Sequence, residues 1–163
     1  MEYGIEGATA PELSPAIEWI DASGNDMAAV QLGDNPDHFK VIYGFQSWCP
    51  GCHSRGLPAL QKMVDSLADN EKIDFYAVQT VFEGFEANTK DKLLETQQQY
   101  GLKIPFGHDV GSEQTGNRSS IMYNYRTGGT PWFIFIDQTN TVVFNGFHLD
   151  VDKAIEYIRT LDI

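Results

Sequence analysis

The sequence predicts an α/β protein with a mixed central β-sheet that is flanked by helices on both faces. Short apolar runs of strand length alternate with longer segments in which apolar residues recur every three or four positions. Near the C-terminus, two apolar runs surround a turn and a further amphipathic segment follows them. The chain has 163 residues, which is enough for one domain to bury a sizeable core.

The N-terminal part is expected to be extended and then to form a hairpin. Residues 1–15 are rich in Gly, Pro and acidic side chains, so we predict an extended segment there and a domain over residues 16–163. The apolar runs 16–20 and 27–30 surround a turn with Gly and Asn, which predicts a β-hairpin. Residues 32–38 are polar and contain Gly and Pro, and they are expected to form a loop.

A buried strand and a long helix are expected next. Val41–Phe45 is short, apolar and bounded by polar residues, which is typical of a buried strand. From Pro50 to Leu67 the apolar side chains follow the spacing of an amphipathic helix. Pro58 lies inside this helix and is expected to kink it, because proline lacks an N–H and its ring displaces the preceding turn.

The middle of the chain predicts two strands and two helices. Residues 73–82 form the next expected strand, and residues 89–100 the next helix, which Gly101 ends. A short strand is expected at residues 104–106 and a brief helix at residues 119–125. The last three of these elements lie in a long insertion between Phe82 and Gly128.

The C-terminal elements are predicted most clearly. Residues 132–136 and 141–144 surround a turn of four residues and should form an antiparallel hairpin. Apolar residues at helical spacing over 151–161 predict a terminal helix.

The charge balance excludes some classes of partner. The chain has 11 basic and 23 acidic residues, a net charge of −12, which argues against nucleic acid and against an anionic membrane surface. No stretch approaches the roughly 18 apolar residues of a membrane helix. The first residues lack the basic-then-apolar pattern of a signal peptide. We therefore expect a cytoplasmic monomer, or a periplasmic protein if an export signal had been trimmed.

The only two cysteines, Cys49 and Cys52, are three positions apart where a strand should end and a helix begin. A thiol pair at this spacing can close to a disulfide and reopen, so it can carry two electrons. The N-terminus of a helix lowers the pKa of a thiol, and Pro50 suits the first helical position. We therefore predict that Cys49 attacks a substrate disulfide and that Cys52, one turn further on, resolves the mixed disulfide.

A second motif supports the redox interpretation. Thr130 and Pro131 directly precede the apolar strand that begins at Trp132. If the bond before Pro131 is cis, Thr130 exposes its backbone amide and carbonyl, which could pair with an extended substrate beside Cys49. Trp48 is next to Cys49 and is expected to be partly exposed, so Trp48, Thr130 and Pro131 are the candidate substrate-binding residues.

Residues 47–52, read Ser-Trp-Cys-Pro-Gly-Cys, and the Gly-Thr-Pro at 129–131 resemble the thioredoxin superfamily. The Ala-Pro-Glu-Leu at 10–13, the hairpin that follows it and the long insertion before Gly128 resemble its TlpA-like thiol-disulfide oxidoreductases, which are related to redoxins and peroxiredoxins. The resemblance covers roughly residues 10–161. It implies a thioredoxin-like fold with an N-terminal β-hairpin and an insertion before the cis-proline strand.

The same resemblance implies Cys49 as nucleophile, Cys52 as resolving thiol and Pro131 as the cis-proline beside the site. Two positions depart from the pattern. Tyr43 stands where thioredoxin has a buried acid, and Arg55 stands where many TlpA-like proteins have Glu. Neither place therefore holds the usual proton acceptor for Cys52. Glu83 is a candidate substitute but is expected to be a solvated carboxylate, and Arg55 is expected on the solvent face of its helix.

Three alternatives remain. Cys49, Cys52 and His53 match the Cys-x-x-Cys-His signature of covalent haem attachment, and the same three side chains offer ligands for zinc or copper. A thiol peroxidase of the redoxin group is the nearest enzymatic alternative. Peroxiredoxins place Pro and Thr ahead of the reactive cysteine, where this chain has Ile42 and Gln46.

The expected function is therefore a thiol-disulfide oxidoreductase, and the interpretation favours a reductase. We expect it to need no metal and no cofactor. Its substrates would be protein or small-molecule disulfides, and its electron donor is not identified by the sequence.

Overall fold

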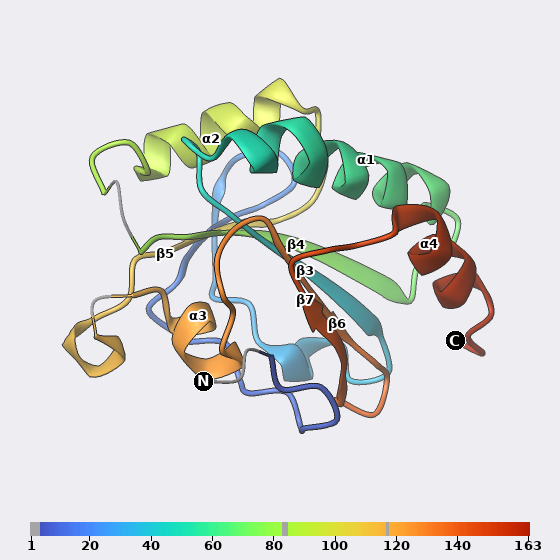
Figure 1. The fold of residues 1–163 in the computed structure, drawn as a ribbon. Helices are drawn as coiled ribbons and strands as arrows, with labels where there is room; N and C mark the ends of the chain where they lie inside the picture. Colours follow the sequence, from blue (N-terminus) through green and yellow to red (C-terminus); the bar gives the residue numbers. More distant parts are fainter. Residues whose placement is uncertain (1–3, 83–84, 117) are drawn as a thin grey trace.

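The structure is a computed structural model that describes residues 4–82, 85–116 and 118–163. At its centre lies a seven-stranded sheet with the order β2-β1-β5-β4-β3-β6-β7 (Figure 1). The strands are β1 (Glu18–Ile20), β2 (Asp26–Met27), β3 (Phe39–Phe45), β4 (Ile73–Thr80), β5 (Phe106–Asp109), β6 (Trp132–Ile136) and β7 (Val142–Gly146). The helices are α1 (Leu57–Ser66), α2 (Lys90–Gln99), α3 (Ser120–Tyr125) and α4 (Val151–Arg159).

The sheet is mixed, as predicted. β3, β4 and β5 pair in parallel at its centre, whereas β6, β7, β1 and β2 add antiparallel pairs toward the two edges. The predicted N-terminal hairpin is present, because β1 pairs antiparallel with β2 and Trp19 faces Met27. The predicted C-terminal hairpin is β6 with β7.

Several boundaries differ from the prediction. The strand expected at 104–106 begins only at Phe106, because Pro105 has no N–H for a ladder and only its carbonyl accepts, from Ala77 N at 3.2 Å. The strand expected at 73–82 ends at Thr80. The loop expected at 32–38 contains a short 3-10 turn.

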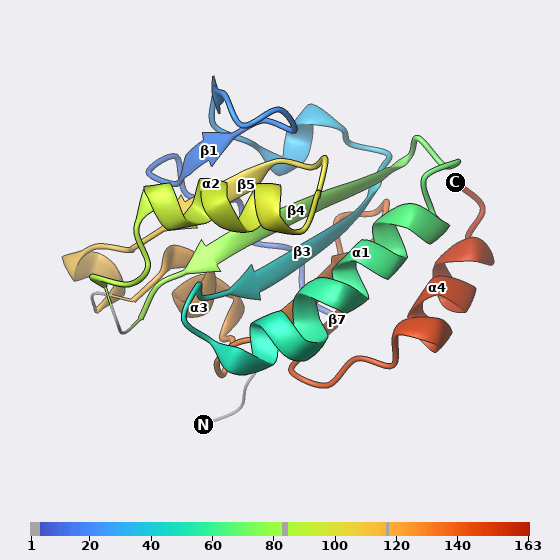
Figure 2. The ribbon, with the colours of Figure 1, turned by 90° about the horizontal axis from the view of Figure 1, so that it is seen from above.

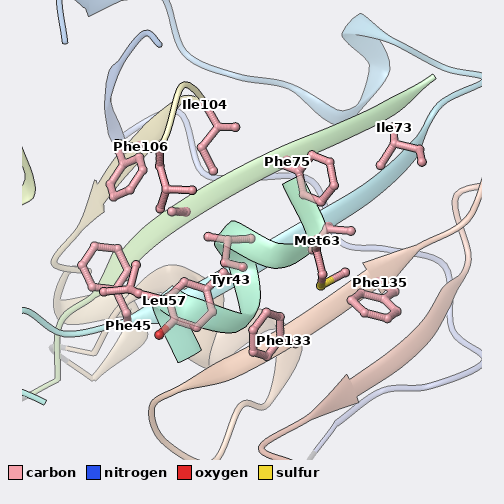
Figure 3. Close-up of a cluster of buried hydrophobic side chains, with 14 of the residues drawn as sticks. Tyr43, Phe45, Leu57, Met63, Ile73, Phe75, Ile104, Phe106, Phe133 and Phe135 are labelled. Atoms are coloured by element: carbon pink, nitrogen blue, oxygen red, sulfur yellow. The ribbon is translucent and has the colours of Figure 1, made fainter. Parts of the chain in front are cut away.

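Two apolar layers cover the two faces of the sheet. Helices α1, α2 and α4 lie on one face, and α3 lies with the N-terminal segment on the other (Figure 2). Neighbouring residues of a strand point to opposite faces, so Tyr43 packs in the first layer and Ile42 in the second. Figure 3 shows the first layer, where Tyr43 lies between Phe133 and Leu57 beneath α1.

The segment before β1 packs against this second layer. Thr9 forms an isolated antiparallel bridge with Thr141, and Ala10 and Leu13 are buried. The Tyr125 hydroxyl donates to the carbonyl of Pro11 at 2.5 Å. Residues 4–15 form no helix and no strand beyond the isolated bridge at Thr9. The division of the chain into two parts at residue 15 stays a prediction.

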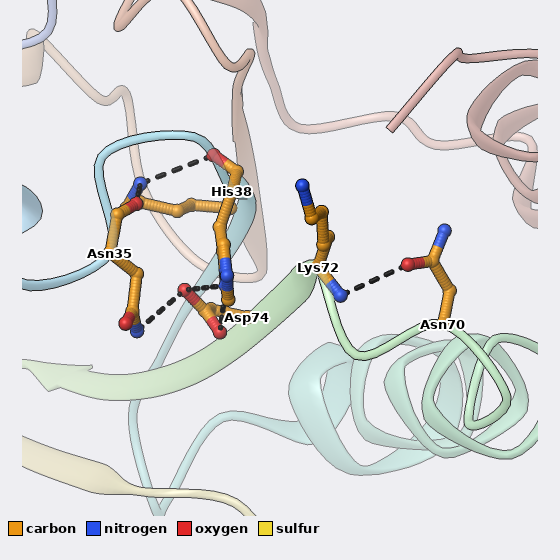
Figure 4. Close-up of polar contacts among 6 residues, drawn as sticks. Asn35, His38, Asn70, Lys72 and Asp74 are labelled. Carbon is orange, nitrogen blue, oxygen red and sulfur yellow. Dashed lines mark hydrogen bonds and ion pairs between the residues drawn. The ribbon is translucent and has the colours of Figure 1, made fainter.

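Polar contacts fix the end of the sheet where β3 and β4 begin (Figure 4). The carboxylate of Asp74 accepts from Asn35 Nδ2 at 3.1 Å and lies 3.1 Å from His38 Nδ1. The buried Lys40 donates from Nζ to the carbonyl of Asn35 at 2.8 Å. This end lies opposite to the cysteines, which follow the last residue of β3.

The helix after the cysteines contains an irregular turn. Cys52–Gly56 is a π-helix that continues directly into α1, with Pro58 at the second position of α1. Pro58 cannot donate a hydrogen bond to the turn before it, and Leu57 N donates five residues back, to the carbonyl of Cys52. The irregularity predicted from Pro58 is therefore a widened turn. Across the described part of the chain, no helix has the length and apolar character needed to cross a membrane.

Candidate active site

The pairing of β3 with β6 brings the two predicted motifs together. These strands are antiparallel neighbours, and Gly44, near the end of β3, faces Trp132, the first residue of β6. The segment after β3 leads to Cys49, and the segment before β6 ends in Pro131. Residues that lie more than 80 positions apart in the sequence therefore meet at one edge of the sheet.

Cys49 sits where the sequence predicts it, just before the first helical turn. Its Sγ accepts the backbone N–H of Cys52 at 3.2 Å, and as a thiol it donates to the carbonyl of Thr130 at 3.6 Å. Cys49 keeps 6% of its surface exposed, whereas Cys52 is fully buried, and both are free thiols. Only Cys49 can therefore meet a substrate directly.

The two thiols have opposite acidities. A hydrogen bond from the Cys52 side chain, then others from the Thr130 side chain and from the amides of Cys52 and Gly51, lower the pKa of Cys49 to about 6, against the opposing effect of burial. Burial first, and then the hydrogen bond to Cys49, raise the pKa of Cys52 well above its usual range. Near neutral pH, Cys49 is a thiolate and Cys52 keeps its proton.

The loop before β6 has the expected geometry. The Thr130–Pro131 peptide bond is cis. Gly51 lies against this loop, since a Cβ placed on it would come within 3.4 Å of Pro131 Cδ. Trp48 is 45% exposed beside Cys49, as expected, whereas Tyr43 and Trp132 are buried in the core.

The whole chain was also compared with known proteins. Its sequence matches the model of the Redoxin family over residues 5–154. The chain belongs to the Redoxin family. No sequence among the curated proteins matches this redoxin.

Solved structures agree with the family. The redoxin is 29% identical to a thioredoxin-like superfamily protein, with a TM-score of 0.80 over 95% of this chain and 97% of that one. It is 25% identical to a thiol-disulfide isomerase from Corynebacterium glutamicum, with a TM-score of 0.76 over 94% of this chain and 97% of that one. The thioredoxin domain of a thiol-disulfide oxidoreductase from Bacteroides vulgatus, 20% identical, has the same fold, with a TM-score of 0.66 over 94% and 97%.

These comparisons confirm the thioredoxin-like fold and the membership in the thioredoxin superfamily that the sequence predicts. The redoxin is a thiol-disulfide oxidoreductase of TlpA-like type.

In this redoxin, Tyr43 fills the place of the buried acid with a neutral group. Its hydroxyl donates to the carbonyl of Cys52 at 3.2 Å, and burial raises its pKa well above the usual range. A Cβ at position 56 would lie 2.0 Å from this hydroxyl, so the contact requires Gly56. Tyr43 therefore braces the π-helical turn and offers no carboxylate to accept a proton. Glu83, the candidate substitute, lies outside the described residues.

His53 is occupied by two hydrogen bonds that the sequence does not reveal. Its Nε2 lies 2.7 Å from the carbonyl of Ser47, and its Nδ1 lies 2.7 Å from the Tyr100 hydroxyl. A carbonyl only accepts, so Nε2 carries a proton and donates it to Ser47. An axial haem ligand would have to break this contact. Within residues 4–82, 85–116 and 118–163, no three His, Cys, Asp or Glu side chains gather as a metal site.

A buried amide pair shapes the turn before Cys49, and sequence reasoning missed it. The Asn88 side chain accepts the N–H of Ser47 at 2.6 Å and donates to Gln46 Oε1 at 3.3 Å. The same Gln46 oxygen accepts the N–H of Phe82 at 3.4 Å. Gln46, at the place of the peroxiredoxin hydroxyl, therefore serves to hold this turn. No signal local to Cys49 points to Asn88, which is 39 positions away.

Arg55 is exposed, as expected, and its guanidinium lies over an aromatic ring. It lies 5.6 Å from the centre of the Phe147 ring, which follows β7. A Cβ on Gly51 would lie 3.6 Å from its Nη2 atom. The charged end of Arg55 thus lies back along the turn that holds the cysteines.

Proposed function

We propose that this oxidoreductase exchanges disulfides through Cys49 as nucleophile and Cys52 as resolving thiol. The observation that supports this most is the opposite pKa shift of the two thiols within one turn of chain. The accessible thiol is the acidic one, and only a thiolate attacks a disulfide.

Two steps balance the reaction. The Cys49 thiolate attacks one sulfur of the substrate disulfide, forms a mixed disulfide and expels the first substrate thiolate. Cys52 then loses its proton and attacks the Cys49 sulfur, which expels the second substrate thiolate. The substrate disulfide gains two electrons from the pair, the proton of Cys52 and one proton from solvent, and it becomes two thiols. The Cys49–Cys52 pair becomes a disulfide.

We further propose that Trp48, Thr130 and Pro131 contact the substrate. Trp48 adds an exposed apolar ring beside Cys49, and the Thr130 carbonyl is already within reach of the Cys49 sulfur. An extended substrate strand could therefore pair its backbone with Thr130 while its disulfide meets Cys49. Protein or small-molecule disulfides are the proposed substrates, with a separate thiol donor to reduce the pair again.

The proposed direction is reduction of the substrate. This direction follows the generally reductive character of the family that the sequence resembles. The Cys49 thiolate, stabilised to a pKa of about 6 against about 7 for the reactive thiol of thioredoxin, acts in the opposite sense, because it favours the reduced form of the pair. For a reductase we expect a reduction potential near thioredoxin's about −270 mV, whereas a value well above it would favour an oxidant or isomerase. Equilibration with glutathione measures this potential, and a value near the about −120 mV of a strongly oxidising periplasmic relative would contradict the proposed direction.

Two serine variants test the roles of the cysteines. Cys49→Ser should abolish the acceleration of insulin reduction by dithiothreitol, because no thiolate remains that can reach the substrate. Cys52→Ser should instead accumulate a mixed disulfide with insulin, visible by mass spectrometry without reductant. Circular dichroism of both variants controls for folding. Undiminished turnover by Cys49→Ser would refute the assignment, and trapping at Cys52 rather than Cys49 would reverse the roles.

A further inference from the structure

We infer that Arg55 makes a groove beside Cys49 selective for disulfides that carry a carboxylate near the reacting sulfur. This inference rests on the proposed function, because it concerns the substrates of the same thiol pair. It assigns to Arg55 a role in recognition, distinct from the acid and base chemistry of the cysteines.

The groove is a cavity of about 490 Å³. It lies between the start of the helix that holds the cysteines, the cis-proline loop and the connection from β7 to α4. Ala59, Phe133 and Leu149 give it apolar walls, and Pro131 joins it to the thiol site. A substrate whose disulfide meets Cys49 would place its flanking groups in this cavity.

Arg55 adds a cation to the lining of this groove. The guanidinium lies over the Phe147 ring at 5.6 Å, and its Nη2 lies beside Gly51, between the two cysteines in the sequence. Contact with an aromatic face holds the guanidinium plane. Within the described ranges Arg55 forms no ion pair, so its N–H donors are available. An arginine held in this way can bind a carboxylate through two parallel hydrogen bonds.

The groove also contains one carboxylate, that of Asp150, which forms no ion pair with Arg55 within the described residues. The carboxylate of Asp150 accepts the N–H of Lys153 at 3.2 Å and so caps α4. His148 stands with its ring edge-on to Phe147, 4.9 Å between centres, and adds no negative charge. The chain as a whole carries a net charge of −12, so an anionic substrate gains attraction only from local cations.

The test uses disulfide-bonded peptides that are identical except for the residue beside the cysteine, which is Glu, Gln or Lys. For the native protein we expect kcat/KM to be about tenfold higher for the Glu peptide than for the Lys peptide, a difference of about 1.4 kcal/mol. This preference should reside in KM and should weaken as salt is added, because Arg55 is exposed.

Variants of Arg55 test whether this residue causes the preference for the Glu peptide. Arg55→Gln should bring the Glu-to-Lys ratio close to one, Arg55→Glu should reverse it, and Arg55→Lys should retain part of it. The matched control is Lys62→Gln, which removes the same charge from α1, where Lys62 pairs with Asp152, and should keep the native ratio. The pKa of Cys49, measured by alkylation with neutral iodoacetamide, should change little in Arg55→Gln, because hydrogen bonds from Cys52, Thr130 and Gly51 are the main causes that lower it.

A small disulfide tests whether the carboxylate belongs to a protein substrate or to a small-molecule substrate. Dithiodiglycolate and its diamide differ only in charge, and a preference for the acid that Arg55→Gln removes would extend the site to small molecules. A preference confined to peptides would assign it to protein substrates. An equal ratio in the native protein and Arg55→Gln would overturn the inference, whereas failure to reduce any peptide would overturn the proposed function instead.

Discussion

At the scale of single residues, the acidity of Cys49 has a different main source from the one that the sequence suggests. The helix start predicts a lowered pKa, and the amides of Gly51 and Cys52 do contribute. The largest cause is the side chain of Cys52, and Thr130 follows. The lowered pKa of Cys49 was predictable from the sequence, but the contribution of Thr130 depends on how β6 pairs with β3.

The reactivity of the reduced protein should follow this pKa. Alkylation of Cys49 by iodoacetamide should rise with pH around a midpoint near 6, because the thiolate forms there, rather than near the roughly 8.5 of a free thiol. Cys52→Ala removes the hydrogen bond that lowers the pKa most, so its midpoint should move to higher pH. Stopped-flow absorbance or mass spectrometry measures the rate.

The direction of the shift also fixes its effect on stability. A thiol whose pKa is lower in the folded than in the unfolded protein stabilises the reduced fold above the unfolded pKa, and this contribution is lost as pH falls through about 6. An alkylation midpoint near pH 8.5 in the native protein, or one that does not change in Cys52→Ala, would contradict the lowered pKa of Cys49 and its assigned cause.

At the scale of elements, the irregular helix shows where the sequence stops being informative. Pro58 predicts an interruption in the right place, but not its form. The form depends on a phenol from β3, since the Cys52 carbonyl accepts both Leu57 N and the Tyr43 hydroxyl. Gly56 leaves space for that hydroxyl. Its requirement for glycine comes from a residue 13 positions earlier, so helix propensity alone cannot predict it.

Substitutions at this contact should couple. Gly56→Ala should destabilise the protein by about 3 kcal/mol or more, because the added methyl would overlap the Tyr43 ring and hydroxyl. Tyr43→Phe should cost about 1 kcal/mol for the lost hydrogen bond. The double variant should be more stable than the sum of the two costs predicts, because one overlap is then absent. Urea unfolding of the reduced proteins measures all three.

If the changes in free energy of unfolding of the two single variants simply added in the double variant, Tyr43 and Gly56 would not interact. That result would contradict the contact in this structure. Ala59→Gly, a substitution in the same helix away from the hydroxyl, is the control and should add to Tyr43→Phe without coupling.

At the scale of the whole molecule, the class of fold was predictable and the order of its strands was not. Alternating runs and the final hairpin predict a mixed sheet, and the family comparison confirms its type. The insertion of β5 between β1 and β4, and the packing of Arg55 against Phe147, both join distant parts of the chain. Local patterns carry no information about either.

The N-terminal segment should contribute to the stability of the whole domain. A chain that starts at residue 16 loses the buried Leu13 and Ala10 and the hydrogen bond from Tyr125 to Pro11. We expect its free energy of unfolding to fall by about 3 kcal/mol, chiefly from the apolar surface that becomes exposed. Urea denaturation compares the two chains, and the alkylation midpoint of Cys49 should not move, since Ala10 and Leu13 pack in the layer on the other face of the sheet from Cys49. An equal free energy of unfolding for the two chains would show that the residues before 16 do not stabilise the domain.

The complete burial of Cys52 has a kinetic consequence. Thiols in solution can reach the mixed disulfide only from the side of Cys49, whereas Cys52 attacks from within the fold as a unimolecular step. The lifetime of the covalent complex is then set by the protein itself and changes little with the concentration of surrounding thiols. The rate at which a bound substrate is released would therefore be the same in oxidising and in reducing surroundings. Only the rate at which the Cys49–Cys52 disulfide is reduced again would depend on the surrounding thiols.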